Sequence, residues 1–173
     1  MKQNTKFKSK KMTMGLLLIY LIVLTWIIVF KMEFDISLLL CTNFRNINLI
    51  PFGDSLVVNG HIDASEILLN VIAFIPFGIY LSIVKNKWNF FQKVLPIFLV
   101  SLSYEIVQYI FAIGGSDITD LIGNTLGGII GIGLFVAIEK ILGKNTVKII
   151  NVLATIGTVF IVIFLSLLAI ANM

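Results

Sequence analysis

Five long apolar runs divide the sequence, and none of them alternates apolar and polar residues. The runs cover residues 14–30, 67–84, 94–113, 121–138 and 149–171. Only the third contains a charged residue, Glu105. Each is close to the ~20 residues that carry an α-helix across ~30 Å of hydrocarbon. Since a backbone in lipid must satisfy its own hydrogen bonds, and barrel strands alternate, we predict an all-α polytopic membrane protein with five transmembrane helices. The second to fourth helices are expected to form a compact bundle.

The composition supports a membrane protein. The chain is 58% hydrophobic and 13% charged, whereas a soluble domain has about 25% charged residues. Its net charge of +4 does not point to nucleic acid, because the lysines lie in short clusters beside the apolar runs, as in membrane topology signals. There is one cysteine, Cys41, so no intramolecular disulfide can form.

The lysine clusters predict the orientation. Eleven of the thirteen Lys and Arg residues precede the first run, separate the second from the third, or separate the fourth from the fifth. With five helices these segments share one side, which should be the cytoplasm of a bacterial plasma membrane. The N-terminus is then cytoplasmic and the C-terminus outside. We divide the chain into a basic N-terminus (1–13), a membrane domain that includes the first helix and the outer loop 31–66 (14–142), and a C-terminal transmembrane helix (143–173).

The outer loop 31–66 is long enough to carry structure of its own. We expect an interfacial helix at 35–44 and a segment at 48–56 that dips back into the bundle. The motif IPFG occurs at 50–53 and again at 75–78, but a tetrapeptide does not establish a repeat.

The helix at 67–84 combines a polar residue with a helix-breaking pair. Asn70, Phe74 and Phe77 share one helix face. Pro76 removes a backbone hydrogen bond and is expected to kink the helix, with Gly78 loosening the same turn. The kink either serves packing or opens space beside Asn70.

Polar stripes mark the next two helices. Ser101, Glu105 and Gln108 form a stripe on 94–113. A carboxylate at the centre of a membrane helix costs on the order of 2.5–3.5 kcal/mol, so Glu105 should face the bundle or a wet cavity. It is either a structural acid or part of a functional site.

A second stripe opens the helix at 121–138. Asp117, Asp120, Asn124 and Gly127 are spaced by three, four and three residues. Both acids suit a helix N-terminus, with Ser116 or Thr119 as its cap. Capping alone would not explain Asn124.

We expect the two stripes to face each other across an outward-facing cavity. The predicted arrangement has Asp117 and Asp120 at the mouth, Glu105 deepest, and Gln108 near Asn124. The predicted ligand-binding residues are Asn70, Ser101, Glu105, Gln108, Asp117, Asp120 and Asn124.

Gly123, Gly127 and Gly131 repeat every four residues on the same helix. Small residues at this spacing allow close helix approach, so we assign them to packing against the helix at 67–84 or at 94–113.

Familiar catalytic and metal motifs are missing from the sequence. It contains no HExxH, CxxC, Walker A or GxSxG pattern, and its single histidine, His61, lies in the outer loop. We therefore predict no metal site and no cofactor, and we assign no catalytic residue. The oxygens of Glu105, Asp117, Asp120 and Asn124 leave a hard cation open as an alternative.

Four blocks resemble the VanZ-like family of bacterial membrane proteins. They are NLIPF at 48–52, NVIAFIPFGIYL at 70–81, SLSYEIVQYI at 101–110 and DITDLIGNTLGG at 117–128. The resemblance covers about residues 43–142. The family pattern carries over onto Asn70, Phe74, Pro76, Phe77, Gly78, Ser101, Glu105, Gln108, Asp117, Asp120, Asn124 and Gly127. Many members have arginine where this chain has Gly114.

The resemblance implies a role in the cell envelope, since the family is named after an accessory protein of glycopeptide resistance associated with teicoplanin. We predict an outward-facing pocket that acts on or shields a lipid-linked or cell-wall component. The other partner is the lipid bilayer, nucleic acid is not a partner, and an oligomer is open. Three alternatives stay open: a small proton- or lipid-coupled transporter acting as an oligomer, a hydrolase or transferase that uses the acids, and a scaffold.

Overall fold

The computed structural model describes residues 2–30, 44–52, 57–58, 61–62 and 64–171. The helices are α1 (Lys2–Ile28), α3 (Ser65–Val84), α4 (Phe90–Phe111), α5 (Ile118–Leu142) and α6 (Thr146–Ala171), with a 3-10 turn at Gly143–Asn145. The strands are β1 (Phe44–Asn48), β2 (Val57–Val58), β3 (His61–Ile62) and β4 (Ile113–Asp117). The prediction of a mainly helical chain is confirmed.

Four helical segments in the described part of the chain are long and apolar enough to cross a membrane. Three of them, Ser9–Ile28, Ser65–Val84 and Phe90–Phe111, fall within α1, α3 and α4. The fourth, Ile118–Leu168, runs through α5, the 3-10 turn and α6. The five separate spans expected from the sequence are therefore not distinguished by length and hydropathy.

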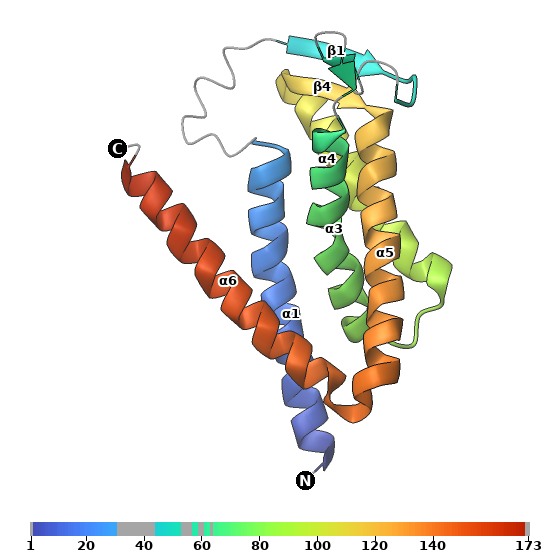
Figure 1. Cartoon of the computed structure of the whole chain (residues 1–173), viewed down its shortest axis with the longest axis vertical. Coiled ribbons are helices and arrows are strands. Elements are labelled where there is room, and N and C mark those ends of the chain that lie inside the picture. Colours follow the sequence, from blue (N-terminus) through green and yellow to red (C-terminus); the bar gives the residue numbers. More distant parts are fainter. Residues whose placement is uncertain (1, 31–43, 53–56, 59–60, 63, 172–173) are drawn as a thin grey trace.

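The centre of the fold is the pair α3 and α5, which lie side by side with α4 behind them (Figure 1). Glycines on α5 make this close approach possible. A Cβ at Gly127 would overlap the carbonyl of Val71, and one at Gly131 would overlap that of Ile75. A Cβ at Gly123 would have more room, 3.6 Å from the Ile67 carbonyl oxygen. The predicted small-residue stripe thus faces α3.

Gly78 and the aromatic residues of α3 serve packing. The helix continues through Pro76 to Val84, and Gly78 lies against the Gly128 carbonyl of α5. Phe74 is fully buried, with its ring centroid 6.3 Å from that of Phe77 and 6.3 Å from that of Tyr104. These aromatic side chains join α3 to α4.

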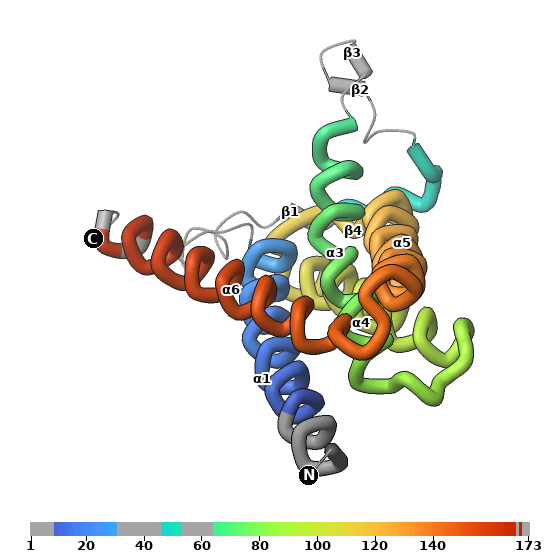
Figure 2. Tube along the Cα trace, turned by 60° about the horizontal axis from the view of Figure 1, so that its bottom comes forward, coloured from blue at the N-terminus to red at the C-terminus, as the bar shows by residue number. Residues whose placement is uncertain are grey.

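Two outer helices complete the molecule. The Thr25 and Tyr104 hydroxyls of α1 and α4 are 2.9 Å apart. Asn151 of α6 accepts a hydrogen bond from Thr13 at 2.9 Å and donates to the Ser9 carbonyl at 3.0 Å. Beyond this polar contact α6 leans away from α1 toward its C-terminus (Figures 1 and 2).

Short strands cap one end of the bundle and correct the all-helical prediction. β1 pairs with β4 in parallel, from Phe44 opposite Ile113 to Asn48 opposite Asp117, and β2 pairs with β3 in a small antiparallel hairpin. The segment between α4 and α5 is therefore a strand, where the sequence suggested a glycine-rich turn. Hydrophobic periodicity misses such pairing because the two strands are far apart in the chain.

Two expectations concerned the outer loop. The interfacial helix at 35–44 falls almost wholly outside the described residues. In the described part of 48–56, Leu49 and Ile50 are each 70% exposed, so these side chains do not pack inside the bundle as a dipping segment would require.

Candidate functional site

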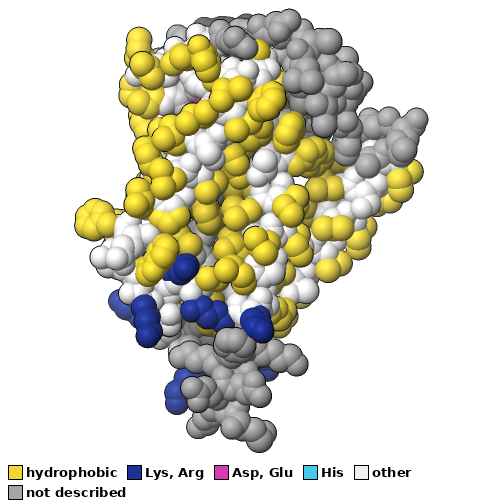
Figure 3. Space-filling view, turned by 180° about the vertical axis from the view of Figure 1, so that it is seen from behind, with side chains coloured by type: hydrophobic (Ala, Val, Ile, Leu, Met, Phe, Trp, Pro, Cys, Tyr) yellow, Lys and Arg dark blue, Asp and Glu magenta, His cyan; other side chains and the backbone are white. Residues whose placement is uncertain are grey.

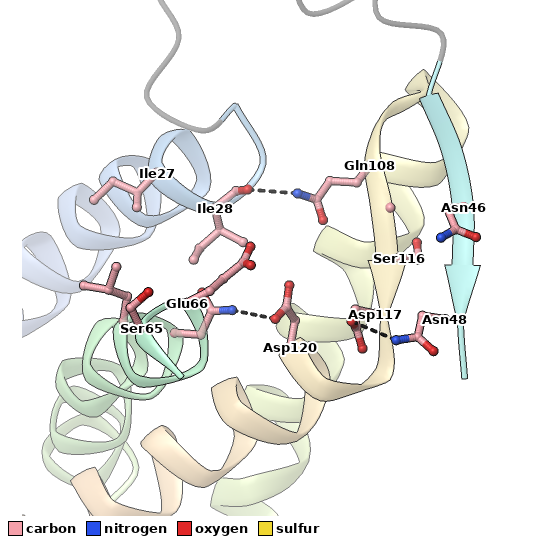
Figure 4. Close-up of a pocket in the computed structure, with 13 residues that line it drawn as sticks. Ile27, Ile28, Asn46, Asn48, Ser65, Glu66, Gln108, Ser116, Asp117 and Asp120 are labelled. Atoms are coloured by element: carbon pink, nitrogen blue, oxygen red, sulfur yellow. Dashed lines mark hydrogen bonds between the residues drawn. The ribbon is translucent and has the colours of Figure 1, made fainter. Parts of the chain in front are cut away.

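A cavity of about 490 Å³ lies where the bundle meets the β1–β4 sheet (Figure 4). Residues from α1, α3, α4, α5 and both strands contribute to its wall. Its described lining consists of Ile27, Ile28, Asn46, Asn48, Ser65, Glu66, Leu69, Asn70, Gln108, Gly115, Ser116, Asp117 and Asp120. Four of the seven predicted ligand-binding residues belong to this lining: Asn70, Gln108, Asp117 and Asp120.

Asp117 is held by the strand pair and by the start of α5. It is the last residue of β4 and the N-cap of α5, with its Oδ1 accepting the Thr119 N–H at 2.7 Å. Its Oδ2 accepts from Nδ2 of Asn48 at 3.1 Å. A carboxylate at this position interacts favourably with the helix dipole. The cap is therefore Asp117 itself, and the prediction of Ser116 or Thr119 was wrong.

Thr119 links the segment after β1 to α5 through its hydroxyl group. It is fully buried, and its Oγ1 accepts the backbone N–H of Phe52 at 3.0 Å. This bond ties the chain after β1 to the first turn of α5.

Asn70 and Asp120 connect α3 and α5 at the cavity floor. Nδ2 of Asn70 donates to Oδ1 of Asp120 at 2.8 Å, and the Asn70 side chain is 8% exposed. Asp120 makes a further interaction of its own. The predicted opening beside Asn70 is thus filled in part by a carboxylate of the next stripe.

Gln108 joins α4 to α1. Its Nε2 donates to the Ile28 carbonyl at 2.9 Å, near the end of α1, and its side chain is 4% exposed. This carbonyl belongs to the last turn of α1, where intrahelical donors are lacking. Gln108 therefore forms part of the cavity wall. The predicted contact between Gln108 and Asn124 was wrong, because Gln108 bonds to Ile28 and Asn124 bonds to Ser101.

Glu105 supports the sheet and lies on a second, smaller cavity of about 270 Å³, together with Asn48, Ser116 and Asp117. Its Oε2 accepts the backbone N–H of Asp117 at 3.0 Å, and its main-chain carbonyl accepts from the Ser116 hydroxyl at 2.8 Å. The remaining lining is mostly apolar. Glu105 thus lies beneath the N-terminus of α5 and orients Asp117.

Ser101 and Asn124 are not on either cavity. Both are fully buried, and Nδ2 of Asn124 donates to the Ser101 hydroxyl at 2.9 Å. This bond joins α4 to α5 one helical turn below Glu105. The prediction that they line the pocket, with Glu105 deepest, is corrected by this arrangement.

The structure adds lining residues that the sequence analysis missed. Asn46 and Asn48 come from β1, and Glu66 comes from the first turn of α3. Glu66 precedes Asn70 by four residues, so the helical spacing already placed the two on one face. The asparagines alternate along FRNIN, which is strand spacing that a search for helices overlooks. Gly114, where the resemblance has arginine in many members, pairs with Arg45 across the sheet.

The lining is rich in carboxylate and carboxamide groups. Within the described residues no group of three or more His, Cys, Asp and Glu side chains is arranged to hold a metal ion. The described lining offers hydrogen-bonding and charged groups without a serine–histidine or cysteine–histidine pair. Such a wall is suited to binding a polar group.

These features define a helical membrane protein with an acidic, amide-lined cavity at one end of its bundle. The chain belongs to the VanZ/LLP1 family, whose sequence model matches residues 17–142. It is also 36% identical over 157 residues to Protein VanZ of Enterococcus faecium, an alignment that covers 91% of this chain and 92% of that protein. The resemblance inferred from the four blocks is thereby confirmed. No solved structure matches the chain significantly.

Proposed function

We propose that the chain crosses a bacterial plasma membrane five times, with its N-terminus in the cytoplasm and its C-terminus outside. The division of Ile118–Leu168 into two spans is supported by the lengths of α5 and α6, which have 25 and 26 residues. The 3-10 turn between them is flanked by Lys140, Lys144 and Lys148. A lysine-rich turn between two apolar helices is a cytoplasmic signal. The division into 1–13, 14–142 and 143–173 belongs to the same proposal.

The cavity then faces the outside. Lysine side chains gather at one end of the molecule (Figure 3). The cavity is formed at the opposite end, where α4 ends and α5 begins. This separation is the observation that carries the proposal, because lysines beside apolar helices favour the cytoplasm.

The proposed function is to bind or shield a component of the cell envelope in this cavity. The family's association with teicoplanin resistance makes glycopeptide resistance the phenotype to test. The cavity is wide enough for a small polar group but lacks a partnered nucleophile among its described lining residues. This favours binding over the hydrolase or transferase alternative.

The orientation predicts which positions are accessible from outside. In a Cys41→Ser background, a cysteine at position 61 should react with a membrane-impermeant thiol reagent on intact cells, and a cysteine at position 87 should not. Position 87 should react only after the cells are opened. The reverse pattern would place the cavity on the cytoplasmic side and defeat the proposal.

The binding role predicts a loss of resistance without a loss of protein. In a teicoplanin-susceptible host that lacks a relative of this chain, Asp117→Asn and Asp120→Asn should each reduce the protection given by the wild-type chain. The double variant should approach the vector control. Glu139→Gln is the matched control, because Glu139 is an exposed acid at the other end of α5.

Growth is measured against teicoplanin concentration, and the amount of folded protein is measured by size exclusion of a fluorescent fusion. Full protection from the folded double variant would refute the binding role of the cavity. No protection from the wild-type chain would remove glycopeptide resistance as its phenotype.

A further inference from the structure

We propose that the cavity recognises a ligand through a positively charged ammonium group. This inference rests on the proposed binding function and adds the chemical class of the ligand. It is carried by two kinds of group that meet in one wall: carboxylates, and buried carboxamides that present their oxygen atoms.

The carboxylates come from two sides of the cavity. Glu66, on the first turn of α3, is exposed and lies at the rim. Asp117 faces it from the β4–α5 junction, where it accepts bonds from Asn48 and from the Thr119 N–H. Both of these Asp117 partners are neutral donors, so they do not cancel its charge.

The buried carboxamides provide the second observation. The side chains of Gln108 and Asn70 are 4% and 8% exposed. The amide nitrogen of Gln108 donates to the Ile28 carbonyl, and that of Asn70 donates to the Asp120 carboxylate. Among the described residues, no donor reaches Oε1 of Gln108 or Oδ1 of Asn70. Neither oxygen is among the buried side-chain atoms that lack a partner, and both residues line the cavity, so both oxygens are open to the cavity and available to a donor.

The side chains converge on one space. Figure 4 shows the Glu66 and Asp120 carboxylates and the Gln108 carboxamide pointing toward one another across the cavity. Among the described residues, the side chains that face this space are therefore mainly acceptors. An ammonium group has three donors and a positive charge, so it complements both the hydrogen-bonding pattern and the charge of Glu66 and Asp117. Charge-assisted hydrogen bonds of this type are about twice as strong as neutral ones.

The geometry does not distinguish a soluble amine from an amine on a lipid headgroup. The shared chemistry is the ammonium group, and the source is resolved by the experiment. Wild-type protein, purified in detergent or held in nanodiscs, is tested by thermal stability and by calorimetric titration.

The soluble arm compares glucosamine with N-acetylglucosamine, which keeps the ring and removes the charge. The lipid arm compares nanodiscs of phosphatidylglycerol with nanodiscs that also contain lysyl-phosphatidylglycerol. We expect at least one amine to bind about tenfold more tightly than its uncharged or amine-free counterpart, or to raise the melting temperature where the counterpart does not. Stabilisation in the lipid arm alone identifies a headgroup amine, and binding in the soluble arm alone identifies a free one.

The variants show whether the cavity is the binding site. Glu66→Gln should weaken binding, and Glu66→Gln with Asp117→Asn should remove the preference for the amine, whereas Glu139→Gln should leave it unchanged. Glu66 is exposed at the rim of the cavity, and the melting temperature without ligand verifies that the variants remain folded. Equal binding of the charged and uncharged probes, no response in either arm, or an unchanged preference in the folded double variant would each overturn the inference.

The inference and the proposed function fail separately. If the Asp117→Asn and Asp120→Asn variants lose teicoplanin protection while no amine binds, the cavity works but its ligand is not an amine. If amine binding depends on Glu66 and Asp117 while those variants keep full protection, the cavity binds an amine for another purpose.

Discussion

Gly127→Ala should destabilise the protein, although alanine is the better helix former. The added Cβ would overlap the carbonyl of Val71 and lie 2.9 Å from its carbonyl carbon and 3.0 Å from its Cα. All three atoms belong to the backbone of α3, so no side-chain rotation relieves the overlap, and the two helices must separate. Overpacking of this kind costs typically about 1–3 kcal/mol, and Gly127→Leu should cost more.

Two other glycines of α5 make this a graded test. A Cβ at Gly133 meets nothing within 4 Å, and one at Gly123 lies 3.6 Å from the Ile67 carbonyl, an ordinary contact. The melting temperature in detergent should therefore fall for Gly127→Ala and stay unchanged or rise for Gly133→Ala, with Gly123→Ala close to the wild type. An equal effect at positions 127 and 133 would mean that α3 and α5 do not pack as described.

Sequence alone predicted what depends on local pattern. The apolar runs fix the helices because hydrocarbon excludes unpaired backbone groups. The stripe of Gly123, Gly127 and Gly131 predicts a close helix contact, which the structure finds between α3 and α5. The polar stripes also predict that α4 and α5 face each other, as the bond between Ser101 and Asn124 confirms.

The depth at which the two stripes meet could not be predicted from the sequence. After Ala112, the five residues of β4 lead from α4 to α5, and they pair with β1 in a parallel register. This pairing brings the Asp117 N–H to Glu105, so the next partners below are Ser101 and Asn124. Gln108 is left above the start of α5, where it reaches α1. The pairing of β1 with β4, two strands far apart in the sequence, thus determines which polar residues reach the cavity. The spacing of residues within either segment does not predict this pairing.

Glu105→Leu is expected to have the second large effect, on the junction between β4 and α5. Glu105 is 6% exposed, and its Oε2 accepts the Asp117 N–H at 3.0 Å. Leucine has a similar size but no acceptor, so this N–H at the start of α5 would lose its side-chain partner. The bond is partly buried, so its loss should cost less than the roughly 1–3 kcal/mol of a fully buried unsatisfied donor, and the position of Asp117 at the cavity should loosen as well. We therefore expect a lower melting temperature together with reduced teicoplanin protection.

Glu105→Gln separates the hydrogen bond from the charge. The glutamine side chain keeps the shape and retains one oxygen that can accept the Asp117 N–H, whereas it removes the negative charge. If Glu105 acts by positioning Asp117, Glu105→Gln should lose less than half of the stability that Glu105→Leu loses, and it should restore protection relative to leucine. Equal destabilisation by the two variants would show that the charge of Glu105, and not its bond to Asp117, holds the junction. A folded Glu105→Gln protein without protection would show that the charge itself acts in function, because the positioning bond alone would then be insufficient.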